Sequence, residues 1–409
     1  MKYLLNEADR CLKCKNPKCK NNCPINTPIP EVIRLFEENK IHEAGEILFN
    51  NNPLSAITAI VCPHEDQCKG NCIRGIKGEP VSFCEIERYI AEEYLKELTI
   101  EKVPSNNKKV AVVGSGPAGI TASILLAQKG YDVTIFELRD KIGGVLTYGI
   151  PEFRLPRSIV DNLESKLIQL GVHIKTNTIV GPVITMDKLL LDGYDAVFIG
   201  TGVWSPKMLN IKGETLGHSF YAIDYLKNPS RYKLGDRVVV IGAGNVAMDA
   251  ARSAKHYGSS DVKVYYRRGI EDMTATKAEI KEAQEEGVKF NTYKSPIEIT
   301  DHGVVFAQTE KVLQTDGSTK LVTLPGEVDL IPCDNVIIAV SQSPQSNIVA
   351  TSPDLQTKFG LLITDSLGNT TKKGVFACGD VVSGAKTVID AVVAAKIIAN
   401  TIDDYCKTL

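Results

Sequence analysis

VAVVGSGPAG, residues 110–119, carries the strongest structural signal in this 409-residue chain. Its apolar start is typical of a strand that is buried on both faces of a parallel sheet. Gly114 permits a tight turn after that strand, Gly116 lets a pyrophosphate approach the backbone, and Gly119 lets the next helix pack on the strand. The following strand, DVTIF, leads to Glu137, where a carboxylate can bind ribose hydroxyls. The segment therefore predicts a Rossmann-like dinucleotide-binding domain.

A second unit of the same kind follows VVVI and contains the motif Gly242-Ala-Gly244-Asn-Val-Ala. Its next strand, VKVYYRRG, offers Arg267 and Arg268 where the first unit has an acid. A carboxylate at this place would repel a 2′-phosphate, whereas arginine can pair with it. The pattern favours NADP(H) over NAD(H); the alternative is that the arginines are simply exposed at a strand end.

The chain also repeats itself, because YDAVFIGTG at 194–202 resembles CDNVIIAVS at 333–341. Each segment would form the last strand of a nucleotide-binding half. This order predicts two nested domains, the first formed by 108–230 and 334–409 and the second by 231–333. The fold class is therefore α/β, with two nested Rossmann-like domains.

Two nucleotide sites without a substrate domain suggest FAD in the first domain and NADP(H) in the second. A turn at Gly379-Asp380 and a helix from about Ala385 support this, since the positive end of that helix would point at the flavin. No acid–base dyad or Ser/His/Asp set stands out. Hydride transfer to a flavin needs none, because the two cofactors are held face to face, so no catalytic residue is assigned.

Eight of the eleven cysteines lie in the first 84 residues, and seven of them form two ordered sets. These sets are Cys11-x2-Cys14-x4-Cys19-x3-Cys23 and Cys62-x5-Cys68-x3-Cys72, and proline follows both Cys23 and Cys62. Such a pattern is typical of iron–sulfur ligation. A zinc site is the alternative, but it usually shows two short cysteine pairs. Residues 1–98 are expected to form a small α-helical iron–sulfur domain, and a polar linker at 103–109 separates it from the remainder.

The net charge and the distribution of apolar residues argue against some classes of function. A net charge of −2 gives no electrostatic case for nucleic acid as a partner. The start of the chain does not read as a signal peptide and no run of about 18 apolar residues occurs, so we expect a cytoplasmic protein without a membrane span. Four lysines interleave with the first cysteines and form either a solvated face or a docking patch for an acidic electron carrier. They are Lys13, Lys15, Lys18 and Lys20.

The combination of these motifs resembles the small subunits of NADPH-dependent glutamate synthase. It is similar also to the N-terminal flavin part of dihydropyrimidine dehydrogenase and to the large subunit of electron-bifurcating ferredoxin:NADP oxidoreductase. The resemblance covers essentially the whole chain and is carried by CLKCKNPKCKNNCP, CPHEDQCKGNC, GEPVSFCEIERYI, VAVVGSGPAG, GGVLTYGIPEFRLP, VVVIGAGNVAMDAAR and FACGDVVSGAKTVIDA.

The resemblance implies two [4Fe–4S] clusters with ligands that cross between the cysteine sets. The ligands implied for one cluster are Cys11, Cys14, Cys19 and Cys72. Those for the other are Cys23, Cys62, Cys68 and a non-cysteine side chain that matches Glu87. Cys84, one helical turn from Glu87, is the alternative fourth ligand.

The resemblance and the motifs together assign the cofactor-binding positions. The positions for FAD are Gly114, Gly116, Pro117, Ala118, Gly119, Glu137, Gly143, Gly144, Arg154, Pro156, Thr201, Gly202, Gly379, Asp380 and Thr387. Those for NADP(H) are Gly242, Gly244, Asn245, Val246, Arg267 and Arg268. The chain departs from its relatives at Ser341-Gln342, where they usually have Gly-Gln. The side chain of Ser341 would narrow the gap near the cofactors.

The implied function is that of an NADPH-linked iron–sulfur flavoprotein that passes electrons to a partner subunit, as a glutamate synthase small subunit does. The alternative is the NADP(H)-binding subunit of a ferredoxin-coupled or electron-bifurcating complex. A disulfide reductase of the thioredoxin reductase type would need a C-x-x-C beside the flavin, and residues 85–409 contain none. A non-enzymatic interaction module is disfavoured by the two intact glycine motifs.

Overall fold

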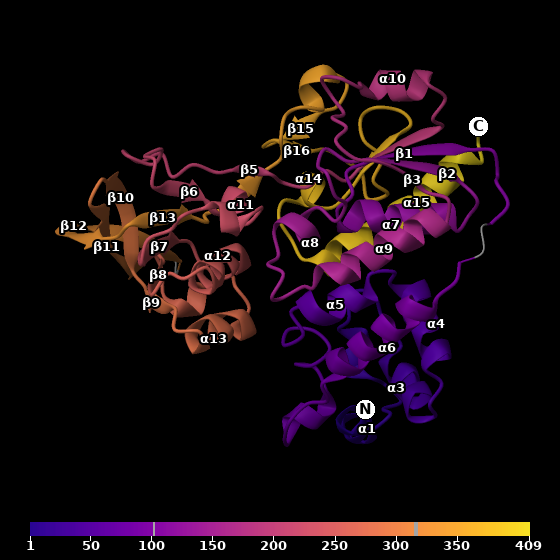
Figure 1. Cartoon of the computed structure of the whole chain (residues 1–409), viewed down its shortest axis with the longest axis horizontal. Coiled ribbons are helices and arrows are strands. Elements are labelled where there is room, and N and C mark those ends of the chain that lie inside the picture. Colours follow the sequence, from indigo (N-terminus) through magenta and orange to yellow (C-terminus); the bar gives the residue numbers. More distant parts are fainter. Residues whose placement is uncertain (101–102, 315–317) are drawn as a thin grey trace. The chain divides into compact units, whose positions relative to one another are not determined.

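The computed structural model describes residues 1–100, 103–314 and 318–409, and these fall into two compact units. The first unit comprises Met1–Thr147, Glu152–Val203 and Ser343–Leu409, and the second comprises Tyr148–Pro151 and Trp204–Gln342. Figure 1 labels the elements of both units. Among the described residues, no helix is both long and apolar enough to cross a lipid bilayer.

The N-terminal part of the first unit is helical, as its sequence predicts. Its elements are α1 (Lys2–Asp9), α2 (Lys18–Asn21), α3 (Ile29–Glu37), α4 (Ile41–Asn51), α5 (Ser55–Val61), η1 (Ile73–Ile76) and α6 (Phe83–Glu97). Apolar side chains from α3, α5 and α6 are fully buried, among them Phe36, Ile57 and Ile86. Removing such side chains from water is the main force that packs these short helices together.

The remainder of the first unit is built on a parallel sheet in the order β17-β4-β1-β2-β3. Its strands are β1 (Lys109–Val113), β2 (Asp132–Phe136), β3 (His173–Lys175), β4 (Ala196–Ile199) and β17 (Val375–Ala377). Its helices are α7 (Pro117–Ala127), α8 (Val145–Tyr148), α9 (Arg157–Gln169), α10 (Met186–Leu191), α14 (Asp380–Ser383) and α15 (Val388–Cys406). Val110, Ala111 and Val112 are wholly buried, which explains the continuous apolar run of β1.

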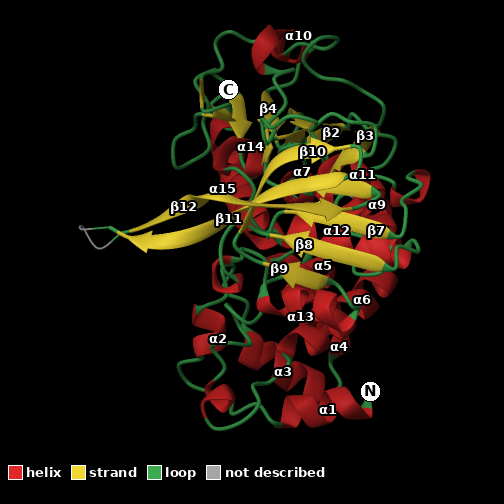
Figure 2. Ribbon diagram, turned by 90° about the vertical axis from the view of Figure 1, so that its left-hand side faces the viewer, coloured by secondary structure: helices red, strands yellow, loops and turns green. Residues whose placement is uncertain are grey.

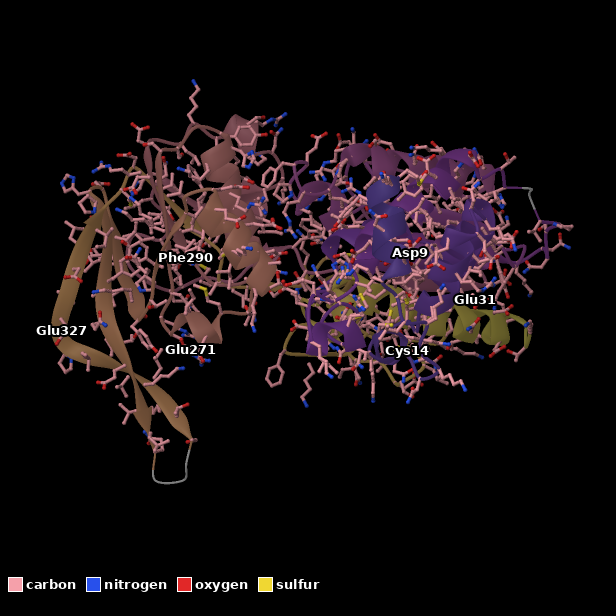
Figure 3. The ribbon with its side chains drawn as sticks, turned by 90° about the horizontal axis from the view of Figure 1, so that it is seen from below. Asp9, Cys14, Glu31, Glu271, Phe290 and Glu327 are labelled. Carbon is pink, nitrogen blue, oxygen red and sulfur yellow. The ribbon has the colours of Figure 1, made fainter. Side chains whose placement is uncertain are left out.

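The second unit holds another parallel sheet, in the order β6-β13-β7-β8-β9. Its strands are β6 (Ser219–Tyr221), β7 (Arg237–Ile241), β8 (Asp261–Tyr265), β9 (Lys289–Asn291) and β13 (Asn335–Ile338). Its helices are α11 (Ala222–Tyr225), α12 (Asn245–His256) and α13 (Lys277–Glu285). A separate antiparallel sheet contains β10 (Lys294–Thr300), β11 (Gly303–Leu313) and β12 (Thr319–Pro332). Figure 2 shows the β11–β12 hairpin extending beyond the sheets of its unit, and Glu327 marks β12 in Figure 3.

The boundaries of the nested domains differ from those predicted. In the parallel ladder, Ile337 of β13 pairs with Phe220 of β6 and with Val240 of β7. Strands at both ends of the inserted segment thus belong to the second sheet, so the prediction that the first domain extends to 230 and resumes at 334 is wrong. The insertion instead runs from Trp204 to Gln342. Short strands next to a predicted boundary carry no sequence signal of which sheet they will join.

The helical N-terminal part packs on the first Rossmann-like domain instead of forming a compact unit of its own. The ammonium of Lys396 on α15 donates to the carbonyl oxygen of Asn51 at 2.5 Å. The ammonium of Lys166 on α9 donates to the carbonyl oxygen of Leu98 at the same distance. Helices α5 and α15 also contact each other. These contacts hold the cysteine-rich segment against one face of the nucleotide-binding domain.

Candidate functional site

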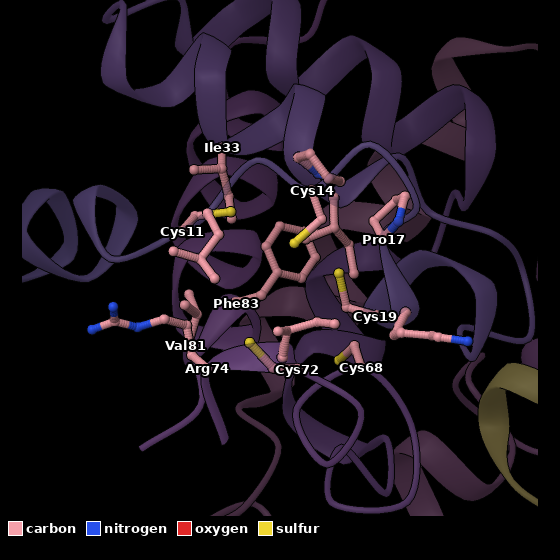
Figure 4. A pocket seen from close by; sticks show the side chains of 15 residues that line it. Cys11, Cys14, Pro17, Cys19, Ile33, Cys68, Cys72, Arg74, Val81 and Phe83 are labelled. Atoms are coloured by element: carbon pink, nitrogen blue, oxygen red, sulfur yellow. The ribbon is translucent and has the colours of Figure 1, made fainter. Parts of the chain in front are cut away.

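Five cysteines from distant parts of the N-terminal segment line one cavity. They are Cys11, Cys14, Cys19, Cys68 and Cys72. Figure 4 shows their sulfur atoms around a shared space beside the ring of Phe83. The structure therefore brings together the four ligands that the resemblance implies for one cluster, and Cys68, which was assigned to the other cluster, lines the same cavity.

Local backbone geometry places these thiols. The amide of Cys11 donates to the carbonyl oxygen of Ala8 at 2.9 Å as α1 ends, and Lys13 turns the chain with a φ of 48°. Cys19 lies within α2, and Cys72 caps the N-terminus of η1. Tight turns between short helices are what allow thiolates from separate segments to surround one inorganic group.

The pKa values of these thiols also show that Cys11, Cys14, Cys19 and Cys72 lie close together. Burial, together with the charges of Cys72, Cys11 and Cys14, raises the pKa of Cys19 to about 11. Burial likewise raises the pKa of Cys11, again reinforced by Cys14 and Cys72. Thiols that oppose each other's ionisation in this way fit a site in which bound iron supplies the compensating positive charge.

A second group forms around Glu87, which lies on α6 and is buried. Burial raises the pKa of the Glu87 carboxyl to about 8. The pKa of Cys62 lies well above its usual range. Burial is the largest cause, and the negative charges of Glu87, Cys68 and Cys23 add to the shift. Cys62 caps the C-terminus of α5, and the thiol of Cys23 lies 3.3 Å from the hydroxyl of Thr27. Cys62 and Cys68 thus both lie near Glu87 and Cys23, the other two ligands implied for this cluster.

Cys84 lies near this second group as well. Burial, then the charge of Glu87, then that of Cys84 raise the pKa of Cys68. Burial raises the pKa of Cys84 itself to about 11, although the nearby Lys69 opposes the shift. Within the described ranges, no three His, Cys, Asp or Glu side chains converge closely enough to hold a single metal ion. Glu87 and Cys84 thus both remain candidates for the fourth position.

The first glycine motif forms a backbone cradle at the start of α7. Gly114 has a φ of 95°, and a Cβ on Gly119 would stand 2.0 Å from the carbonyl oxygen of Gly114. A Cβ on Gly144 would stand 2.8 Å from the Cα of Gly116. The glycine-rich turn and the segment that contains Gly143 and Gly144 therefore approach as bare backbone. Only glycines permit this approach, which leaves amide groups free of side chains at the helix N-terminus, as a pyrophosphate requires.

Glu137 is buried directly beneath this turn. Its carboxylate accepts hydrogen bonds from the amide of Ser115 at 2.9 Å, from the hydroxyl of Ser115 at 2.5 Å and from the amide of Arg139 at 2.9 Å. The end of β2 is thus fixed to the turn after β1. This network fits the predicted ribose-binding role because it sets the orientation of the carboxylate before any ligand arrives.

The C-terminal motif closes the same end of the sheet. Gly379 caps α14 with a φ of 74°, and a Cβ there would lie 3.4 Å from the Cβ of Ala118 at the start of α7. Burial raises the pKa of Asp380 to about 6. Thr387, the N-cap of α15, shares a capping box with Asp390. The capping box and the perturbed carboxyl were missed by the sequence analysis, although Thr-x-x-Asp before an apolar run is a recognisable capping signature.

The remaining positions assigned to FAD flank this cradle. Thr201 and Gly202 follow β4, and a Cβ on Gly114 would lie 3.0 Å from the Cα of Thr201. Pro117 and Ala118 open α7, and Pro156 caps the N-terminus of α9. Arg154 is half-buried just before that helix. The FAD positions from the glycine motifs gather where the parallel strands end, the usual place for a ligand in such a sheet.

The second glycine motif repeats the arrangement in the other unit. Gly242 has a φ of 145°, and a Cβ there would stand 2.2 Å from the carbonyl oxygen of Ala339. Gly244 caps α12, and the side-chain oxygen of Asn245 accepts from the amide of Thr276 at 3.1 Å. Val246 is half-buried on the first turn of α12. The N-terminus of this helix is likewise suited to phosphate.

Arg267 and Arg268 are exposed immediately after β8. Two hydrogen bonds hold their backbone in place. The hydroxyl of Thr309 donates to the carbonyl oxygen of Arg267 at 2.7 Å, and the amide of Tyr293 donates to the carbonyl oxygen of Arg268 at 3.2 Å. A fixed backbone with exposed guanidinium groups suits the recognition of a phosphate monoester.

Ser341 has a φ of 120°, a backbone conformation that favours glycine. This is the position at which the sequence departs from the Gly-Gln of its relatives. Replacing Ser341 with glycine is expected to stabilise the protein by about 1 kcal/mol, because relief of the backbone strain exceeds the entropic cost of glycine.

Denaturant unfolding of the two forms measures this difference. The matched control is Ser260→Gly, at an exposed position with ordinary backbone geometry, which should lower stability by up to about 1 kcal/mol. Equal losses in both variants would contradict the strain at Ser341.

Comparison with known proteins identifies both parts of the chain. Residues 108–396 match the family model of pyridine nucleotide-disulphide oxidoreductases. Residues 2–99 match that of dihydropyrimidine dehydrogenase domain II, 4Fe-4S cluster. The glutamate synthase [NADPH] small chain of Escherichia coli is 30% identical, over 98% of this chain and 91% of its own length. The NAD-dependent dihydropyrimidine dehydrogenase subunit PreT of Salmonella typhimurium is 32% identical, over 98% of this chain and 94% of its own length.

Among solved structures, Mycobacterium tuberculosis FprA in complex with NADPH aligns with a TM-score of 0.64 at 21% identity. The alignment covers 75% of this chain and 85% of FprA, and it supports the fold alone. The two family matches and the near full-length relatives agree with the two glycine cradles and the cysteine groups. The chain therefore belongs to the pyridine nucleotide-disulphide oxidoreductase family, as a member with an N-terminal 4Fe-4S domain and with similarity to glutamate synthase small chains over nearly its whole length.

Proposed function

We propose that this protein oxidises NADPH and delivers the electrons, through FAD and two [4Fe–4S] clusters, to a partner subunit. The observation that carries the proposal is that Cys11, Cys14, Cys19 and Cys72 line one cavity, while Cys62 and Cys68 lie near Cys23 and Glu87. A protein that held a single cluster would need only one such group.

The order of the two groups supports a linear path for electrons. Cys62 ends helix α5, which contacts α15, and the charge of Asp390 at the start of α15 contributes to the raised pKa of Cys62. The group around Glu87 therefore lies beside the first nucleotide-binding domain. Cys11, Cys14 and Cys19 belong to the other group, which lies between α2 and η1.

The residues of the first domain fit FAD. When bound, FAD would accept a hydride from NADPH and release its electrons singly to the iron–sulfur clusters. The bare turn at Gly114 and Gly116 would hold its pyrophosphate, and Glu137 its ribose. The N-terminus of α15 at Thr387 presents a partial positive charge, which favours an anionic ligand. These residues bind and orient, and none of them needs to transfer a proton.

NADP(H) is favoured over NAD(H) in the second domain. Arg267 and Arg268 stand where a carboxylate would otherwise repel the 2′-phosphate. The relatives are named both as NADPH and as NAD-dependent proteins, so the preference rests on these two side chains of this chain.

The partner is proposed to resemble the large subunit of a glutamate synthase, because this chain covers nearly the whole length of the small chains. A ferredoxin-linked or electron-bifurcating flavoprotein is the second candidate. It is supported by the β subunit of the NADP(+)-dependent formate dehydrogenase of Moorella thermoacetica, which is 32% identical over 95% of this chain and 60% of its own length.

Anaerobic purification followed by cofactor analysis tests the core of the proposal. We expect one FAD and about eight iron atoms per chain, and bleaching of the flavin absorbance on addition of NADPH. Absence of flavin would overturn the proposal, and about four iron atoms would reduce it to one cluster. Capture of the partner from native cells, followed by mass spectrometry, then distinguishes an amidotransferase-type large subunit from a ferredoxin-type flavoprotein.

The fourth ligand of the cluster near Glu87 can be decided by substitution. We propose Glu87 as that ligand, so Glu87→Ala is expected to lower iron content by about four atoms per chain. Cys84→Ala should leave the iron unchanged, and it is the matched control because Cys84 lies on the same helix beside the same thiols. Loss of iron in Cys84→Ala alone would exclude Glu87.

A further inference from the structure

The segment that carries Cys11 to Cys23 has a charge unlike that of the remaining chain. It contains four lysines and no acid, whereas the whole chain carries −2, so the remainder carries −6. Lys13 is neutralised by an ion pair with Glu37 at 2.6 Å. Lys15 and Lys18 are exposed, and neither ammonium forms an ion pair with any side chain in the described ranges. Positive charge on this surface is therefore largely uncompensated.

The second cysteine segment adds to the same surface. Lys18 and Arg74 both line the cavity that holds Cys11, Cys14, Cys19 and Cys72. Figure 4 shows Arg74 directed away from the sulfur atoms. Lys77 follows η1 and is also exposed. We call Lys18 and Arg74, together with Lys15 and Lys77, which are exposed and close to them in sequence, the cationic rim.

Apolar side chains lie among these cations. Leu12 and Ile73 line the same cavity, yet they are 55% and 38% exposed. Ile76, next to Lys77, is 76% exposed. An apolar centre with a charged margin is the composition of a protein-binding surface, and exposed branched aliphatic residues in three neighbouring places are otherwise unfavourable.

We propose that the cationic rim and its three apolar residues form the docking surface for an acidic electron-carrier protein, which receives electrons from the adjacent cluster. The inference rests on the proposed function, because it names the surface at which electrons leave. Charge complementarity selects the occupant: a cationic rim attracts an acidic carrier and repels a basic one. Oxidation of one NADPH yields NADP⁺, one proton and two electrons, so two one-electron carriers are reduced in each turnover.

Kinetics with two protein acceptors test the surface. Rubredoxin is a small acidic one-electron carrier, and cytochrome c is a basic one. With NADPH as donor, the second-order rate constant for rubredoxin is expected to fall roughly 10- to 100-fold in K15E/K77E at low ionic strength. Neither Lys15 nor Lys77 is a proposed ligand or lines the cavity. Reduction of a small neutral quinone should be unchanged, which verifies that the flavin site is intact.

The matched control is K358E/K373E, which reverses two exposed lysines in the nucleotide-binding part of the same unit. This control should change the rate constant for rubredoxin by less than about twofold. High salt screens the surface charges, so the rate constants of wild type and both variants should become similar. Equal rates in wild type and K15E/K77E, or a faster wild-type reaction with cytochrome c than with rubredoxin at low salt, would overturn the docking surface.

Binding provides a readout that is independent of turnover. Immobilised wild-type protein is expected to bind rubredoxin by biolayer interferometry at low salt, and K15E/K77E to bind it at least about tenfold more weakly. Undiminished binding by K15E/K77E would reject the cationic rim even if the purified protein lacked flavin or iron. Lack of flavin or iron, with normal salt-sensitive binding, would instead reject the proposed function alone.

Discussion

Replacing Cys72 with serine is expected to remove about four of about eight iron atoms and to slow reduction of a protein acceptor by at least about 100-fold. Cys72 comes from the second cysteine set but lines the cavity of Cys11, Cys14 and Cys19. Serine is a poor ligand for iron, so that cluster would be lost while the group around Glu87 stays intact. Reduction of the flavin by NADPH should persist, because it precedes the clusters in the proposed path.

Iron analysis, flavin content and stopped-flow reduction by NADPH together measure this outcome. Cys333→Ser is the matched control, since Cys333 is also buried but lies in the second unit, apart from both cysteine groups. It should keep its iron. Loss of all iron in Cys72→Ser would show that the two groups depend on each other, and unchanged iron would exclude Cys72 as a ligand.

Replacing both Arg267 and Arg268 with alanine is expected to lower kcat/KM for NADPH by about 100-fold and to leave that for NADH nearly unchanged. Hydrogen bonds to charged groups contribute about 1.5 kcal/mol each at the low end, and two of them correspond to about 3 kcal/mol, or about 100-fold. Both guanidinium groups are exposed after β8 and are therefore accessible to a ligand phosphate.

Steady-state kinetics with both nicotinamide cofactors and a small neutral acceptor measure the change. Arg231→Ala is the matched control, because Arg231 is an exposed arginine of the same unit in a short 3₁₀ helix. It should leave the preference for NADPH intact. An equal loss of activity with NADPH and NADH would contradict recognition of the 2′-phosphate and indicate a structural role.

The sequence by itself determined the fold class. A short apolar run that ends in a glycine-rich turn is typical of a strand buried on both faces, and the glycines at 114, 116 and 119 lie where backbone approaches backbone, so β1, the turn and α7 follow from local requirements. Cysteine spacing and the prolines after Cys23 and Cys62 likewise indicate iron–sulfur ligation without knowledge of the fold.

Only the tertiary structure decided which segments meet. Strand β13 pairs with β6 and β7 through residues 117 and 97 positions apart, and no local pattern encodes that choice, so the domain boundaries were predicted incorrectly. The structure also brings Glu87 and Cys84 to the same thiols. The strain at Ser341 and the meeting of Leu12, Lys18 and Arg74 at one cavity depend on long-range packing, because backbone conformation and burial are set by residues distant in the sequence.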